Sequence, residues 1–186
     1  NEFHYDNAGT DQDEFVEVAF PAEMANLNGY YLEFYNGRTG SNHGKRYKTM
    51  ELSTCVNGGQ VGGKKFCSVA VLKFQNGNRG GDGLALVDPN NIVLQFISYE
   101  GTITAIQGAA QGMTSTDIGV QETKNTPVGH SLQLGGTGCA LSEFAWQSPR
   151  SATKGNINSN QVLDNCGGST NAPTTLPPTQ FPTPAP

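Results

Sequence analysis

The sequence predicts an all-β fold: an antiparallel β-sandwich of about eight or nine short strands, followed by an extended tail. Of its 186 residues, 24 are Gly and 10 are Pro, and only 15% are charged, which is typical of a domain rich in turns. Short runs of β-forming residues recur at close spacing, and no long stretch has the periodicity of an amphipathic helix. A chain of this length can bury a substantial core.

The stretch 83–101 is expected to form the central hairpin. Leu84–Val87 is apolar, Asp88–Asn91 interrupts the run, and Ile92–Tyr99 follows with strong β-formers. Proline presets φ, and Asp and Asn side chains can bond the backbone groups of their own turn. Because the second run is apolar on both faces for most of its length, we expect a central strand that is covered on both sides.

Further strands are expected wherever shorter β-forming runs are bounded by turn residues. In chain order these are Phe3–Tyr5, Phe15–Phe20, Tyr30–Tyr35, Thr49–Leu52, Phe66–Phe74, Val128–Leu134 and Leu141–Trp146. His4 alternates with two aromatic residues and is expected to face outward. The polar passage 102–126 has no clear period, so we expect an excursion loop with one short turn of helix at most.

The third of these runs has two distinct faces. Tyr30, Leu32 and Phe34 share one face and are the better core set, while Tyr31 and Tyr35 share the other.

Four cysteines, Cys55, Cys67, Cys139 and Cys166, form an even set without CxxC or Cys/His zinc spacing. This favours two disulfides, and of the three connectivities we expect the local one, Cys55–Cys67 and Cys139–Cys166. The first bond would pin the Gly-rich loop 56–66. Disulfides indicate an extracellular protein. The chain opens at Asn1 without Met or a leader, as expected of a secreted product whose signal has been removed, or of a chain cut there by design.

Composition and motifs argue against several classes of protein. A net charge of −5 argues against nucleic-acid binding, and no apolar run approaches the roughly 20 residues of a membrane span. His4, His43 and His130 are isolated, and no GxSxG or HExxH motif accompanies them. The Gly-rich runs lack the Lys and helix of a phosphate loop. We therefore expect no catalytic residues and no enzyme.

The best candidate ligand site is an acidic loop near the start of the chain. Asp6, Asn7, Asp11, Asp13 and Glu14 offer hard oxygen ligands within nine residues, as calcium requires. The spacing does not match an EF-hand, and the alternative is an ordinary solvated turn. Calcium is the one cofactor that the sequence suggests.

Composition changes abruptly at residue 167. The segment 167–186 holds six of the ten prolines and five threonines, which favours an extended polyproline II form. It is either a linker or an O-glycosylated stalk. The candidate glycosylation positions are Thr170, Thr174, Thr175, Thr179, Thr183, Pro177, Pro178, Pro182 and Pro184. No Asn-x-Ser/Thr sequon occurs, so any glycans would be O-linked.

Six stretches together resemble a known family. They are NEFHYDNAGTDQDEFVEV, LNGYYLEFYNG, GDGLALVDPNNIVLQFISYEG, MTSTDIGV, TPVGHSLQLGGTG and FAWQSPRSATKGNIN. Over residues 1–158 the chain resembles the lamin-tail domain of secreted microbial proteins. The resemblance implies an immunoglobulin-like sandwich, here 1–166. It also implies a module that often accompanies secreted nucleases or phosphatases and is usually non-catalytic. The cysteines and the tail, 167–186, are not part of the family pattern.

Two functions from different classes follow. The first is a non-enzymatic extracellular structural protein that self-associates into a filament or surface layer, with its tail docked on the next sandwich. Val162, Leu176 and Phe181 are the apolar anchors in or near the tail, and Val162–Leu163 is the better candidate for an added strand. The alternative is an accessory or binding module of a secreted nuclease or phosphatase, with the tail as linker.

Overall fold

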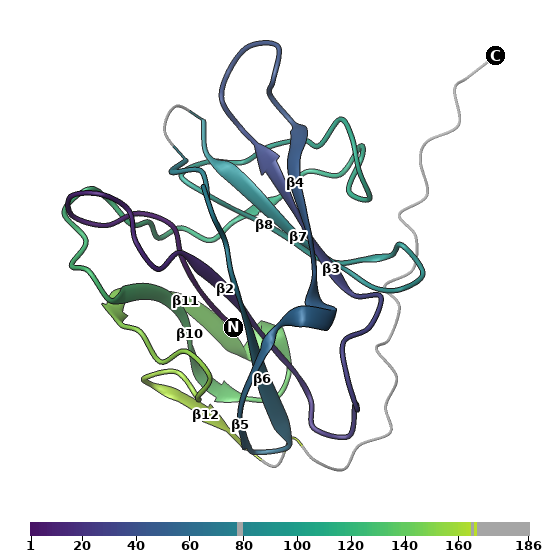
Figure 1. Cartoon of the computed structure of the whole chain (residues 1–186), viewed down its shortest axis with the longest axis vertical. Helices are drawn as coiled ribbons and strands as arrows, with labels where there is room; N and C mark the ends of the chain where they lie inside the picture. The colour runs from purple at the N-terminus through teal and green to yellow at the C-terminus, as the bar shows by residue number, and fades with distance from the viewer. Residues whose placement is uncertain (78–79, 165, 167–186) are drawn as a thin grey trace.

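A computed structural model describes residues 1–77, 80–164 and 166, and it confirms the all-β sandwich. Two sheets pack face to face (Figure 1). The seven-stranded sheet has the order β11(Phe144–Ser151), β10(His130–Gly138), β1(Glu2–His4), β2(Phe15–Pro21), β6(Lys64–Ala70) and β5(Val56–Val61), with β12(Gln161–Leu163) also paired to β10. The five-stranded sheet has the order β4(Lys45–Glu51), β3(Tyr31–Asn36), β7(Asp82–Val87), β8(Val93–Tyr99) and β9(Thr116–Asp117). The architecture is consistent with an immunoglobulin-like sandwich.

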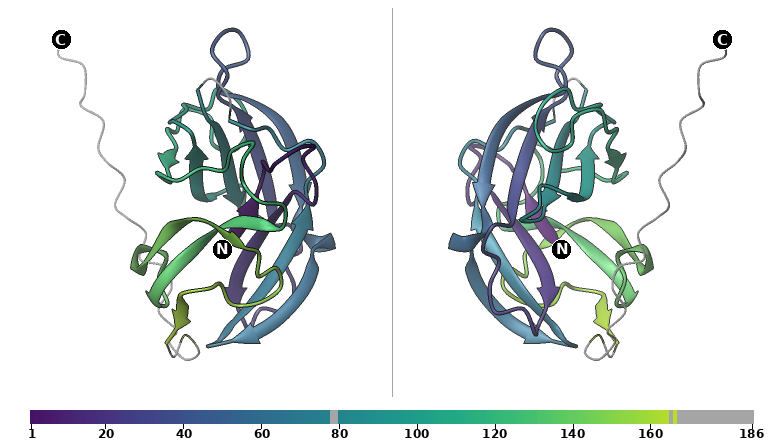
Figure 2. Two further views of the ribbon diagram at one scale, coloured as in Figure 1. Left: turned by 90° about the vertical axis from the view of Figure 1, so that its left-hand side faces the viewer. Right: turned by 90° about the vertical axis from the view of Figure 1, so that its right-hand side faces the viewer.

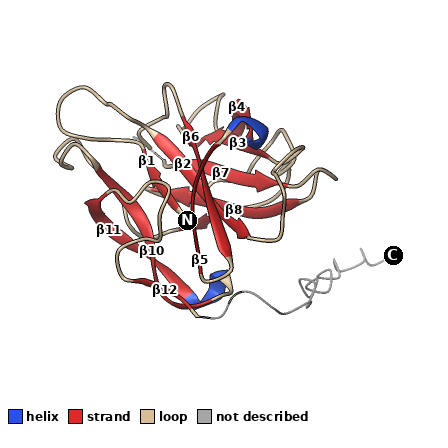
Figure 3. Cartoon of the chain, turned by 60° about the horizontal axis from the view of Figure 1, so that its bottom comes forward, coloured by secondary structure: helices blue, strands red, loops and turns tan. Residues whose placement is uncertain are grey.

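Helix is confined to two short 3₁₀ turns, η1(Leu52–Thr54) and η2(Leu141–Glu143) (Figure 3). In the part of the chain that the structure describes, no helix is long and apolar enough to cross a membrane.

The central hairpin forms as predicted. β7 and β8 pair antiparallel, with Leu84 opposite Ile97. In the turn, Asp88 Oδ1 accepts hydrogen bonds from the backbone N–H groups of Asn90 at 2.9 Å and Ile92 at 2.8 Å. Residues of β8 are buried on both faces, since Ile97 joins the core between the sheets and Phe96 joins a second cluster on the outer face. The predicted coverage on both sides holds for Phe96–Tyr99, whereas Leu94 in the first half of the strand is 53% exposed.

The outer face of the five-stranded sheet is covered by the excursion 102–126. Ile103, Ala105 and Ala110 from this segment are buried against Tyr35 and Phe96. The backbone N–H of Ala110 donates to the Tyr35 hydroxyl at 3.2 Å. The short helical turn allowed for this passage does not form among the described residues. The segment instead supplies β9, which runs parallel to β8, because an apolar sheet face must be covered.

The Gly-rich segment after Cys55 is a strand, not the predicted loop. β5 pairs antiparallel with β6 through a two-residue turn, Gly62–Gly63, whose φ angles are +55° and +79°. Positive φ at both central residues is the geometry of a type I′ hairpin, which Gly adopts without strain. The Gly-Gly pair was the sequence signal for this turn. With β9 and β12, this strand brings the total above the eight or nine expected.

Aromatic side chains fill the space between the sheets. Phe3, Tyr5, Phe74 and Tyr99 form one cluster, in which the rings of Tyr5 and Tyr99 stack with centroids 4.1 Å apart. The two layers that this cluster joins are seen edge-on in Figure 2. Leu32 and Phe34 face this core, as predicted, and Tyr30 packs against it.

Both predicted disulfides form. Cys55, directly after η1, is bonded to Cys67 across the β5–β6 hairpin, and Cys139 is bonded to Cys166. Local pairing is correct in both cases because each pair is separated by a short length of chain, 12 and 27 residues.

Candidate functional site

A groove lies at the edge of the sandwich, where β8 and β9 approach β10, η2 and β11. It has a volume of about 680 Å³. We call it the edge groove and define it by its apolar lining residues, Leu94, Phe96, Ile97, Met113, Ile118, Leu134, Leu141, Phe144 and Trp146. The lining is completed by Gln95, Thr114, Thr116, Asp117 and Ala145. Among the lining residues, which all belong to the described chain, Asp117 carries the single ionisable side chain.

Several of these apolar side chains are open to solvent. Leu94 is 53% exposed, Leu141 is 49% exposed and Met113 is 42% exposed. They come from three separate segments of the chain, so their proximity is a product of the fold. A contiguous exposed apolar surface on a small domain commonly marks an interaction site. The mixture of Met, Leu and aromatic residues suits a surface that adapts to an occupant.

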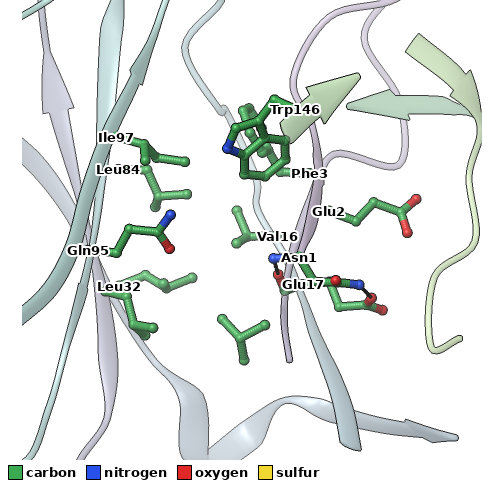
Figure 4. A pocket seen from close by; sticks show the side chains of 12 residues that line it. Asn1, Glu2, Phe3, Val16, Glu17, Leu32, Leu84, Gln95, Ile97 and Trp146 are labelled. Carbon is green, nitrogen blue, oxygen red and sulfur yellow. Dashed lines mark hydrogen bonds between the residues drawn. The ribbon is translucent and has the colours of Figure 1, made fainter. Parts of the chain in front are cut away.

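The inner end of the edge groove leads toward the core. A small cavity of about 30 Å³ lies between the sheets and shares Gln95, Ile97 and Trp146 with the groove. Figure 4 shows Trp146 beside Phe3, with Gln95 and Ile97 on the facing sheet. The indole ring packs edge-on against Phe3, with centroids 5.1 Å apart. Trp146 therefore forms the boundary between the groove and the hydrophobic core.

Two hydrogen-bond donors on the groove wall have no protein partner. Neither the Trp146 indole N–H nor the Gln95 side-chain amide bonds to any residue in the described part of the chain. Both donors remain open to water, since neither is among the described buried polar atoms that lack a partner. An occupant that brings carbonyl acceptors would satisfy both donors.

The Cys139–Cys166 disulfide lies at one end of the groove. The Cα atoms of the pair are 5.2 Å apart, and Leu141 of the groove follows Cys139 by two residues. Glu143 Oε2 accepts hydrogen bonds from the backbone N–H of Cys139 at 2.9 Å and of Ala140 at 2.8 Å, and these bonds lower the pKa of Glu143. The disulfide thus holds Cys166, the last described residue, next to the groove.

The residues predicted to bind calcium do not gather around one point. Asp13 is exposed, and Glu14 accepts the backbone N–H of Phe74 at 3.3 Å. The Asn7 side chain is used within the loop, where it donates to the Thr10 carbonyl at 3.1 Å. Among the described residues, no group of three or more His, Cys, Asp or Glu is arranged to hold a metal ion. Calcium binding stays a prediction.

Asp6 and Asp11 instead line a second pocket with Glu100 and Glu122. Burial and the nearby carboxylate of Asp11 raise the pKa of Asp6 to about 6. This convergence was not predicted, because Glu100 and Glu122 come from distant parts of the chain.

The outward orientation predicted for His4 is wrong. Its side chain is 2% exposed, and Nδ1 lies 2.9 Å from the Glu122 carboxylate. Nε2 faces two acceptors, the Gln12 carbonyl at 3.0 Å and Asn7 Oδ1 at 3.1 Å. Burial lowers the pKa of His4, but the hydrogen bond and charge of Glu122 together with these acceptors outweigh it and raise the pKa.

Glu122 is the buried partner of His4 that the sequence did not indicate. Its Oε2 accepts the backbone N–H groups of Tyr5 at 2.6 Å and Asp6 at 3.0 Å, and the residue is fully buried. The pair with His4 therefore ties β1 to the end of the excursion. Alternation of residues could not reveal that His4 is buried, because β1 lies inside the sheet and all three of its residues are buried. With both side chains enclosed, this pair supports the fold and is closed to a substrate.

The residues predicted for self-association divide into two groups. Val162 and Leu163 form β12, which pairs parallel to β10 of the same chain, with Thr137 opposite Val162. The Val162 side chain is 52% exposed. Leu176, Phe181 and all nine candidate glycosylation positions lie outside the described residues.

Comparisons of the chain with protein-family models, with curated proteins and with solved structures return no match.

Proposed function

We propose that the protein is a non-enzymatic extracellular structural protein that associates with copies of itself through an apolar contact. The observation that carries this proposal is the edge groove, where Leu94, Met113 and Leu141 are each about half exposed. Covering such side chains is favourable by about 25 cal/mol for each Å² removed from water. A partner that fills the groove would also accept hydrogen bonds from the Trp146 indole N–H and the Gln95 amide in place of water, since neither has a partner among the described residues.

Three features support an extracellular polymer over a lone binding domain. Two disulfides in one small domain suit an oxidising compartment. The Pro/Thr composition of 167–186 suits an O-glycosylated segment that projects from a sandwich. The resemblance to secreted lamin-tail domains agrees with both the sandwich and this location. Assembly would then give a filament or a surface layer.

The test is the association state of the full chain. Sedimentation over a concentration series and electron microscopy should show growth from monomer to extended assemblies, and intact mass should exceed 19.7 kDa if the native chain carries glycans. A chain that stays monodisperse and monomeric at all concentrations would overturn self-association. That result would favour the accessory module of a secreted hydrolase.

A further inference from the structure

We propose that the edge groove is the receptor for the Pro/Thr segment, residues 167–186, of a second copy of this chain. The inference rests on the proposed function and deepens it by naming both contacting surfaces. One copy would donate its tail and the next would supply the groove.

The chemistry of the groove matches a proline-rich occupant. Polyproline II chains have no internal hydrogen bonds, so their carbonyl groups remain free as acceptors. Two side chains that line the groove, Trp146 and Gln95, have donors without a partner among the described residues, and the carbonyl groups of a bound tail would replace water on them. Phe144 and Trp146, which are partly exposed, supply aromatic surface. Grooves lined by aromatic residues are the usual receptors of proline-rich segments, because such segments lose little entropy on binding.

Charge also favours this occupant. The chain as a whole carries a net charge of −5, whereas residues 167–186 carry no charged side chain. The one ionisable residue that lines the groove, Asp117, has its Oδ1 engaged with the backbone N–H of Gly119 at 3.0 Å. An uncharged segment can therefore enter the groove without burying an unpaired charge, and a charged one would be disfavoured.

The tail has two large apolar side chains that can anchor it. Leu176 and Phe181 are five residues apart, which corresponds to about 16 Å in a polyproline II conformation. The partly exposed side chains of Leu94 and Met113 come from one wall of the groove, and Leu141 comes from the other. These three groove side chains would contact the Leu176 and Phe181 side chains of the second copy.

The geometry of the chain favours a second copy over the same one. Cys166 is held beside the groove by Cys139, so the tail starts there. At about 3.1 Å per residue, an extended segment carries Leu176 roughly 31 Å away from Cys166. Returning to its own groove would require a sharp reversal, which a proline-rich segment resists. A tail that enters the next molecule makes a heterologous contact, and repetition of that contact gives an open filament.

The test uses two full-length variants with complementary defects. The first, Leu176→Ser with Phe181→Ser, keeps the groove and loses the anchors. The second, Leu94→Glu with Leu141→Glu, keeps the tail and places charge at two exposed positions of the groove. Each variant alone should be monomeric, with the apparent dissociation constant raised roughly 100-fold over the native chain. Mixed in equal amounts, they should form a heterodimer and stop there.

A matched control and a local probe complete the design. Leu72→Glu with Ile92→Glu alters two apolar residues that are 80% and 57% exposed outside the groove, and this variant should assemble like the native chain. Trp146 is the only Trp of the chain, so its emission reports directly on the groove and should shift to the blue when the heterodimer forms. Circular dichroism and melting confirm that each variant is folded.

The outcomes separate the inference from the proposed function. If the native chain assembles but the groove variant assembles equally well, or the mixture stays monomeric, the groove is not the receptor and self-association stands. If the native chain is always monomeric, self-association fails. In that case the inference fails too. If Trp146 emission still responds to the tail substitutions, the tail lies in the groove of its own chain. If the emission does not respond, the tail does not bind the groove.

Discussion

Asp82 shows how a single buried carboxylate can join separate loops of the molecule. It is the first residue of β7 and is 4% exposed. Its two oxygens accept the backbone N–H groups of Gly37 at 2.8 Å and Gly77 at 2.9 Å. Burial raises the pKa of Asp82 to about 6, against the opposing effect of these two hydrogen bonds.

The raised pKa makes stability depend on pH. Because the folded state binds the proton of Asp82 more tightly than the unfolded state, whose pKa is near 3.8, the stabilising contribution is complete below pH 4 and is lost as the pH rises through 6. We expect the free energy of unfolding of the native chain to fall by roughly 1–3 kcal/mol between pH 4 and pH 7 from this group. Asp6, whose pKa is also raised to about 6, acts in the same direction.

The variant Asp82→Asn should remove this part of the pH dependence, since the amide does not titrate and its oxygen still accepts one backbone N–H. Urea unfolding at pH 4.5 and pH 7 measures the change. Asp13→Asn, at an exposed carboxylate, is the control and should keep the native pH profile. An equally steep profile for Asp82→Asn would show that another group is responsible.

At the scale of the element, β5 illustrates why a strand can be rich in glycine. It is an edge strand, and the loop near Gly155 crosses it so closely that the backbone N–H of Gly59 donates to the Gly155 carbonyl at 2.6 Å. A Cβ on Gly58 would lie 2.3 Å from the Gly155 backbone, whereas one on Gly59 would lie 3.4 Å from it. The glycine at 58 therefore allows two backbones to touch.

We predict that Gly58→Ala lowers the free energy of unfolding by roughly 1–3 kcal/mol, because backbone on both sides must move to relieve the clash. The neighbouring Gly59→Ala has ordinary van der Waals contact and should change it by less than about 1 kcal/mol. Urea denaturation of both variants gives the comparison. Equal effects of the two substitutions would mean that the loop at Gly155 moves freely.

At the scale of the whole molecule, distant parts of the chain close on one another. β1 lies between β2 and β10, so the first strand is held by residues from far along the chain. Glu2 Oε2 accepts the Thr153 hydroxyl at 2.8 Å, and the Asn158 amide donates to the Asn1 carbonyl at 2.8 Å. The chain has a net charge of −5, and Asp117 is the single ionisable residue among those that line the edge groove.

Because most charged side chains lie outside the edge groove, the salt dependence of assembly can be predicted. A contact made by apolar and neutral polar groups is not weakened by screening, and salt reduces the repulsion between acidic copies. Association of the full chain should therefore be unchanged or stronger when NaCl rises from about 50 mM to about 500 mM. Sedimentation at both concentrations measures it. Dissociation at the higher concentration would mean that ion pairs hold the copies together.

Features that depend on short stretches of chain could be predicted from the sequence. The two apolar runs and the turn residues of 83–101 were enough for the central hairpin, because both strands and their turn lie within 19 residues. Cysteine spacing was enough for the disulfides, since each pair closes a short loop. The abrupt change to Pro and Thr after Cys166 predicts a tail at 167–186, which lies outside the described residues.

Only the tertiary structure decided the features that bring distant residues together. His4 looked like an outward-facing residue because its partner, Glu122, lies 118 positions away. In the acidic loop, Asp6 and Asp11 line a pocket together with Glu100 and Glu122, which come from distant parts of the chain. The edge groove draws on residues from Leu94 to Trp146 and depends on how two sheets pack. Periodicity reports which face of a strand is apolar, and packing alone decides which apolar faces stay uncovered.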